Sequence, residues 1–180
     1  MRLILVAMSF ACCICPMLGC DSQTKSADAA PNEVDSTHSK SPKSRISKIR
    51  LKGSALNKEA FYITVEDLEE LEKHDQVLMD IYEGKRVQYS GMLLRDLVGH
   101  LAPNAKKVTI SAVDDYRVTF TEEEWNQHDI FFATRKNGEQ MSVAQKGPAR
   151  IVIDFAPSQE KLSAILKPKW IWQISTMSFE

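Results

Sequence analysis

Cysteine is missing from most of this chain. Only four of the 180 residues are cysteines, and all of them lie within the first 20 positions, at Cys12, Cys13, Cys15 and Cys20. A disulfide framework, a cysteine-ligated zinc site, an iron–sulfur cluster and a cysteine nucleophile are therefore excluded after residue 20.

Several other features are also scarce. Neither sign of charge is in excess, because 23 Lys and Arg oppose 24 Asp and Glu, so a strongly basic nucleic-acid-binding protein is not expected. No apolar run reaches the roughly 18–20 residues of a membrane-spanning helix. The sequence has no P-loop, G-x-G-x-x-G or G-x-S-x-G motif, and its histidines lack metal-ligand spacing. Nucleotide hydrolysis, Rossmann redox chemistry and esterase chemistry therefore have no support.

The first 19 residues have the form of an export signal. Arg2 supplies a positive charge, and an apolar segment follows over residues 3–15. Residues 17–20 (MLGC) then resemble the bacterial lipobox, in which a small residue precedes the cysteine that receives lipid. We predict a signal at 1–19 and lipidation of Cys20. The alternatives are a cleaved signal with an incidental cysteine and an uncleaved anchor.

The expected location follows from this anchor. Several acyl chains together hold a protein stably on a membrane, so we expect an extracytoplasmic protein attached to the cell membrane by lipid. Asp21 resembles the signal that retains Gram-negative lipoproteins at the inner membrane, which implies its periplasmic face if the source is Gram-negative. Residues 20–45 contain few large aliphatic side chains, so we predict that Cys20 begins a disordered tether. The domain is predicted at 46–180.

The domain alternates short strands with short helices. Periodicity predicts strands at 46–51, where the mixed pattern suggests an edge strand, and at 61–63, 77–82, 87–89, 108–112, 116–120, 130–134, 151–153 and 170–177. Helices are predicted at 64–71 with a Thr64–Asp67 capping box, at 94–101, after Thr121 and after Ser158. Strands outnumber helices and most connections are short, so the predicted class is α+β with a mixed or antiparallel sheet.

Short motifs follow one another in a distinctive order. Residues 89–97 (YSGMLLRDL) precede a helix, residues 137–139 (NGE) follow an apolar strand, residues 146–150 (KGPAR) lead into another, and Lys169-Trp170 open the last. This series resembles the molybdopterin-binding domain of the sulfite oxidase family and is most similar to its short, stand-alone bacterial versions. The resemblance covers 46–180 and implies the sulfite-oxidase-like fold.

Two residues of the family's motifs are absent from this chain. Catalytic members hold molybdenum through a cysteine on the strand after the first helix, and the corresponding stretch here, 77–82 (VLMDIY), has none. Met79 is a thioether and cannot replace an anionic thiolate. The histidine of the family's H-G motif is also missing. The single Arg2 indicates Sec export of an unfolded chain, which would arrive without cofactor. We therefore expect no cofactor, although the resemblance leaves molybdopterin open.

Three cations lie next to the matched motifs. Arg135, Lys146 and Arg150 belong to a region that in the family faces the cofactor's phosphate or an oxyanion. We expect Asp115 and Tyr116, from the turn at 114–116, to lie close to them and complete an anion-binding cleft. The alternative is that the three cations are ordinary loop charges. No catalytic or metal-ligating residue is predicted.

The predicted function is that of a membrane-tethered, non-catalytic binding module. Its ligand is expected to be a small anionic or pterin-like molecule, or a partner protein, and not nucleic acid. One alternative is a molybdopterin-dependent oxidoreductase without the cysteine ligand. The other is an accessory subunit of a membrane sensor or redox complex.

Overall fold

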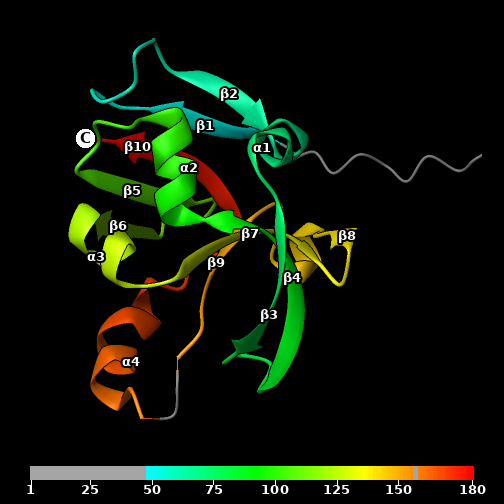
Figure 1. Ribbon diagram of the computed structural model, residues 1–180. Coiled ribbons are helices and arrows are strands. Elements are labelled where there is room, and N and C mark those ends of the chain that lie inside the picture. The colour runs from blue at the N-terminus through cyan, green and yellow to red at the C-terminus, as the bar shows by residue number, and fades with distance from the viewer. Residues whose placement is uncertain (1–47, 156–157) are drawn as a thin grey trace, which may run out of the picture. The chain divides into compact units, whose positions relative to one another are not determined.

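The computed structural model describes residues 48–155 and 158–180, which form two five-stranded sheets (Figure 1). The first sheet has the order β2 (Phe61–Thr64), β1 (Lys48–Lys52), β10 (Ile174–Phe179), β5 (Lys107–Ala112) and β6 (Arg117–Thr121). In it β1 and β10 are parallel, and the other neighbours are antiparallel. The second sheet has the order β3 (His74–Asp80), β4 (Lys85–Leu93), β7 (Ile130–Lys136) and β8 (Glu139–Gln140), with β9 (Arg150–Ile153) paired to β7. The predicted α+β class with mixed strands is confirmed.

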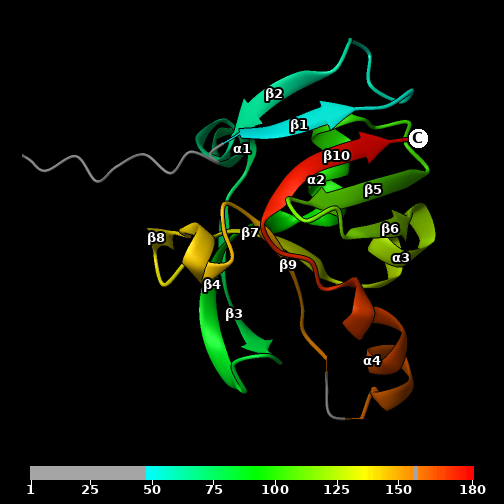
Figure 2. The same ribbon diagram turned by 180° about the vertical axis from the view of Figure 1, so that it is seen from behind.

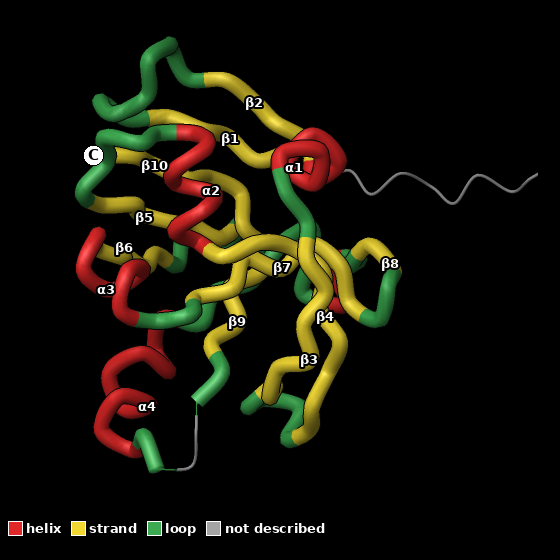
Figure 3. Tube along the Cα trace, in the orientation of Figure 1, coloured by secondary structure: helices red, strands yellow, loops and turns green. Residues whose placement is uncertain are grey.

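The helices are short and follow strands along the chain (Figure 3). They are α1 (Val65–Leu71), α2 (Leu94–Leu101), α3 (Glu122–Gln127) and α4 (Glu160–Leu166), with the 3₁₀ turns η1 (Val143–Gln145) and η2 (Lys167–Lys169). The Thr64 hydroxyl accepts from the Asp67 N–H at 3.1 Å, and the Asp67 carboxylate accepts from the Thr64 N–H at 3.0 Å. The predicted capping box at the start of α1 is therefore confirmed.

Alternating side chains bury one face of the first sheet. Ile49 and Leu51 on β1 are buried, whereas Lys48, Arg50 and Lys52 between and around them are exposed. Helix α2 lies in front of β5 and β10 in Figure 1 and behind them in Figure 2, so it packs on the buried face. Among residues 48–155 and 158–180, no helix covers the opposite face (Figure 1 and Figure 2).

The hydrophobic core is contained within one compact unit. Its buried members extend from Ile49 to Phe179, and the compact unit itself covers residues 40–180. A chain of residues 40–180 therefore holds the complete core that its described residues build.

Three details of the predicted elements are wrong. Strand β1 is not at an edge, because it pairs with both β2 and β10, and its mixed pattern instead reflects one exposed face. The last strand begins at Ile174, because Gln173 has a φ of 52° and interrupts extended backbone before it. The N-cap of α4 is Gln159, whereas Ser158 lies one residue earlier.

The N-terminal predictions cannot be compared with this fold. The signal at 1–19, lipidated Cys20 and the tether to residue 45 all lie outside the described residues. Within 48–155 and 158–180, no helix is long and apolar enough to cross a membrane.

Candidate functional site

A pocket of about 280 Å³ lies between the turn after β3, the β5–β6 turn and the segment that leads into β10. Four aromatic residues line it: Tyr82, Tyr116, Trp170 and Trp172. The Tyr82 ring meets the two tryptophans edge-on, with centroids 5.5 Å from Trp170 and 5.2 Å from Trp172. The Tyr116 hydroxyl donates to the Pro168 carbonyl, which fixes that ring as well. The pocket therefore offers aromatic faces on which a flat ring can stack.

Lys146 supplies positive charge beside this pocket. Its Nζ lies 4.6 Å from the ring centroid of Trp172 and 5.2 Å from that of Tyr82. The backbone of Lys146 has a φ of 69° at the end of η1, and its carbonyl accepts from the Gln173 N–H at 3.2 Å. No acidic side chain of the described segments pairs with Lys146. Its charge remains free to attract an anion.

A buried polar cluster adjoins the pocket wall. The Arg150 guanidinium carbon lies 5.5 Å from the ring centroid of Trp170. Arg150 Nη2 lies 3.1 Å from Asp80 Oδ2, and Arg150 Nη1 donates to the Tyr89 hydroxyl at 3.1 Å. Tyr89 donates in turn to Asp80 Oδ2 at 2.6 Å. Asp80, Tyr89 and Arg150 have no exposed surface.

The Asp80 carboxylate also holds the turn that carries Tyr82. Its Oδ1 accepts from the backbone N–H groups of Tyr82 and Glu83, at 2.9 and 3.1 Å. Burial raises the pKa of Asp80, but the hydrogen bond from Tyr89 and the charge of Arg150 outweigh it, so the pKa lies below its usual value. Burial and the bond to Asp80 raise the pKa of Tyr89. At neutral pH the cluster is an ion pair with a protonated phenol, and Asp80 neutralises Arg150.

Two buried donors of this region have no acceptor. Trp170 Nε1 and Arg150 Nε make no hydrogen bond within residues 48–155 and 158–180. Arg150 Nη2 is at ion-pair distance from Asp80 but likewise lacks hydrogen-bond geometry. Buried donors without acceptors are uncommon in folded proteins. Trp170 also lines the pocket, but its indole N–H is buried and is not exposed to the pocket surface.

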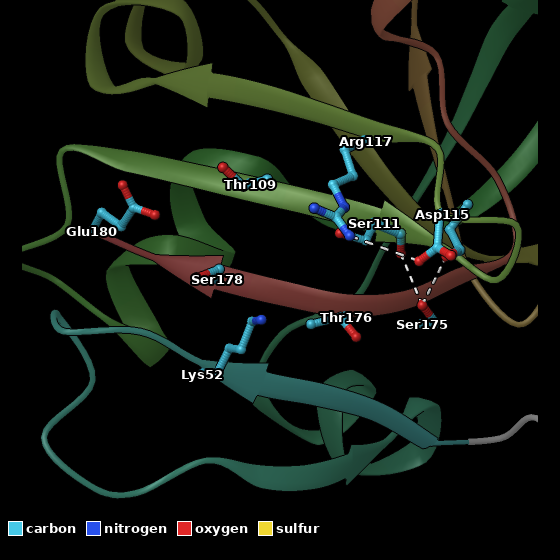
Figure 4. Close-up of a pocket in the computed structure, with 10 residues that line it drawn as sticks. Lys52, Thr109, Ser111, Asp115, Arg117, Ser175, Thr176, Ser178 and Glu180 are labelled. Atoms are coloured by element: carbon cyan, nitrogen blue, oxygen red, sulfur yellow. Dashed lines mark hydrogen bonds and ion pairs between the residues drawn. The ribbon is translucent and has the colours of Figure 1, made fainter.

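The other two residues expected in the cleft do not line this pocket. Arg135 on β7 donates to Glu69 of α1 from Nε at 2.9 Å and from Nη2 at 2.8 Å. This bond with Glu69 raises the pKa of Arg135, so its charge is already compensated. Asp115 lies 3.8 Å from Arg117 and lines a different, polar groove on the first sheet (Figure 4). The structure thus brings Tyr116, Lys146 and, through Trp170, Arg150 to one site.

Sequence reasoning missed Asp80, Tyr89 and Tyr82. One signal for Asp80 was present, because Leu78 and Asp80 have the same parity in an extended strand and both are buried. An acid at an inward position requires a buried partner. The sequence did not show that Arg150, 70 positions later, would be that partner.

A family model for the oxidoreductase molybdopterin-binding domain matches residues 38–180. The chain belongs to this family. The resemblance inferred from the order of the motifs is confirmed. No curated protein sequence matches the chain.

A solved structure with a similar fold is the sulfane dehydrogenase SoxCD from Paracoccus pantotrophus. The TM-score is 0.52 at 15% sequence identity, over 73% of this chain and 37% of that chain. The similarity shows a shared fold. This chain spans little more than a third of the chain that it matches, so the activity of the whole dehydrogenase does not transfer with the fold.

The residues of this family member do not supply the ligand that would hold molybdenum. The stretch 77–82 offers no thiolate, and both oxygens of its Asp80 are already engaged by Arg150, Tyr89 and backbone N–H groups. No group of three His, Cys, Asp or Glu side chains within 48–155 and 158–180 has metal-binding geometry. A thiolate-held metal does not fit these residues. Beside this stretch the site offers aromatic surface and the charge of Lys146.

Proposed function

We propose that this protein is an extracytoplasmic, lipid-anchored binding protein that has given up the family's redox chemistry. Its aromatic pocket, formed by Tyr82, Tyr116, Trp170 and Trp172, takes a small anionic, pterin-like ligand. The observation that carries the proposal is a contrast between two cations. Asp80 neutralises Arg150, whereas Lys146 is left unpaired beside the aromatic rings.

Three features support the ligand class. Tyr82 and Trp172 present aromatic surface beside Lys146, which suits stacking of a planar heterocycle. The ammonium of Lys146, which lies within about 6 Å of the Tyr82 and Trp172 ring centroids, would also attract a carboxylate or phosphate carried by that heterocycle. The volume of about 280 Å³ lies at the small end of ligand pockets, which favours one bicyclic ring over a dinucleotide.

The absent thiolate supports a non-catalytic role. A soft metal centre requires an anionic sulfur ligand, and no cysteine occurs after residue 20. An export signal with a single arginine supports Sec transport of an unfolded chain, which would not bring a folded-in cofactor. Lipidation of Cys20 would then anchor the domain outside the cytoplasm, at the inner membrane if Asp21 acts as the retention signal.

A titration with pterin-6-carboxylate tests the ligand. We expect saturable binding by isothermal titration calorimetry, and loss of at least about tenfold in affinity for Lys146→Glu, because a repulsive charge replaces an attractive one. Lys146→Arg should retain binding. Lys161→Glu makes the same charge change on exposed α4 and serves as the control. Equal binding by Lys146→Glu and Lys161→Glu would contradict the proposal.

The rim of the pocket supports a second candidate, a partner protein. Tyr82 and Tyr116 are each 47% exposed, and Val113 on the same β5–β6 turn is 44% exposed. Aromatic side chains of this kind are typical anchors in protein interfaces. If pterin-6-carboxylate and simple anions fail to bind the wild type, Tyr82→Ala should weaken co-purification of a membrane sensor or redox partner. Unchanged co-purification would contradict this second candidate.

A further inference from the structure

The open face of the first sheet carries a second, polar groove of about 380 Å³ (Figure 4). Its lining comes from four neighbouring strands, β1, β10, β5 and β6, on the side opposite α2. We call this surface the hydroxyl face, because serine and threonine side chains make most of its floor: Thr109, Ser111, Ser175, Thr176 and Ser178. Nothing in the proposed ligand pocket uses these residues.

Cross-strand register orders the hydroxyl face into rows. Arg50 on β1 is level with Thr176 on β10, Thr176 is level with Ser111 on β5, and Ser111 is level with Arg117 on β6. One row therefore has a cation at each end and two hydroxyls between them. Neighbouring strands are roughly 4.8 Å apart, so the two cations stand on strands about 14 Å apart. The adjacent row has a cation at one end only, because it contains Lys52, Ser178, Thr109 and Thr119.

Cations lie around the hydroxyls of this face. Arg50, Lys52 and Lys107 are exposed and have no acidic partner in the part of the chain that is described. The two acids that line the groove, Asp115 and Glu180, lie toward opposite ends of it in Figure 4. An anion bound over the hydroxyls would lie between the unpaired cations of β1 and Arg117, which has Asp115 at 3.8 Å.

Several hydroxyls on the face are also free to bind. Ser111, Thr176 and Ser178 make no side-chain hydrogen bond within the described residues, whereas Thr109 and Thr119 bond to each other at 2.9 Å. A hydroxyl donates to a phosphate oxygen and accepts from an alcohol. Rows of hydroxyls between cations therefore suit ligands that combine phosphate with alcohol groups.

We propose that the hydroxyl face binds the phosphate-bearing glycerol headgroups of an anionic membrane surface. The inference rests on the proposed lipid anchor, which would hold the domain beside a membrane. Strand β1, which carries Lys48, Arg50 and Lys52 on this face, is the first described element after the N-terminal segment. The cations lie on β1, β5 and β6, over a width of four strands, and this spread matches an array of headgroups better than one isolated phosphate. Each basic residue near such a surface contributes roughly fivefold to binding.

Vesicle binding by residues 40–180 tests this without the anchor, because that unit contains the whole core and lacks Cys20. The probes are vesicles of phosphatidylcholine alone and vesicles with one-third phosphatidylglycerol. We expect binding only to the second kind, and at least about tenfold weaker binding for Arg50→Glu/Lys52→Glu. Lys161→Glu/Lys167→Glu makes the same net change on exposed lysines away from the face and should bind like wild type. Thermal unfolding of each variant checks that it remains folded.

Three outcomes would overturn the inference. Equal binding to neutral and anionic vesicles would exclude headgroup charge as the cause. Equal losses in the two double variants would show a general charge effect. Binding of glycerol phosphate or inorganic phosphate in solution without vesicle binding would assign the groove to a soluble anion. None of these results depends on whether Cys20 is lipidated or the aromatic pocket binds a pterin.

Discussion

Arg150 Nη2 lies 3.1 Å from Asp80 Oδ2, and neither side chain has any exposed surface. This pair joins β9 to the end of β3. A buried ion pair contributes little net stability compared with an apolar pair, but loss of one member leaves a charge without compensation. The fold of this chain therefore depends on both charges of the pair being present.

Removal of the Asp80 charge should therefore be costly. We expect Asp80→Asn to lower the free energy of unfolding by about 3–5 kcal/mol, because Arg150 would remain buried and unpaired. Asp129→Asn is the matched control, since Asp129 lies 2.9 Å from Arg95 with its side chain 76% exposed, and its loss should cost at most about 1 kcal/mol. Urea denaturation measures both. If the two substitutions lowered the free energy of unfolding equally, the buried pair would contribute no more to stability than the exposed one.

Acid should remove the contribution of Asp80. Its folded-state pKa lies below the usual value, so the folded state binds the proton more weakly than the unfolded state. The stabilisation is complete above an unfolded pKa of about 4 and is lost as pH falls through the folded pKa. The difference in unfolding free energy between wild type and Asp80→Asn should be constant from pH 7 to about 4.5 and shrink below it. A difference in unfolding free energy that increased as the pH fell would contradict the predicted direction.

Substitution by alanine should have opposite effects on stability at two glycines. A Cβ on Gly91 would lie 2.0 Å from the Phe132 carbonyl oxygen of the paired strand β7, so Gly91→Ala must displace backbone. We expect a loss of at least about 2 kcal/mol. A Cβ on Gly99 in α2 meets nothing within 4 Å, so Gly99→Ala should gain roughly 0.5–1 kcal/mol from helix propensity. Thermal unfolding compares them, and destabilisation by Gly99→Ala would show that this reading of α2 is wrong.

Local signals in the sequence predicted most elements well. The spacing of Leu94, Leu97 and Val98 placed α2 at its observed bounds, and the capping box placed the start of α1. The candidate site was less predictable, because its contacts join residues far apart in sequence. Nothing local to Arg135 indicates that Glu69 compensates it, and a residue's partner depends on register across the sheet.

Lipidation of Cys20 is the basis of the proposed location. The full chain should partition with membranes and incorporate labelled fatty acid, whereas Cys20→Ala should remain an unlipidated precursor. Cys15→Ala lies within the apolar segment and is the matched control, which should label normally. Unchanged labelling of Cys20→Ala would refute the assignment of this anchor.

Elemental analysis of the exported protein tests the central claim most directly. The account predicts far less than one molybdenum per chain in the protein isolated from its own membranes, because the domain of this chain has no cysteine thiolate and Asp80 is occupied by Arg150. The same preparation should show no turnover of sulfite or of a sulfoxide. About one molybdenum per chain, together with turnover of either compound, would contradict the account and establish a molybdenum enzyme that functions without the cysteine ligand.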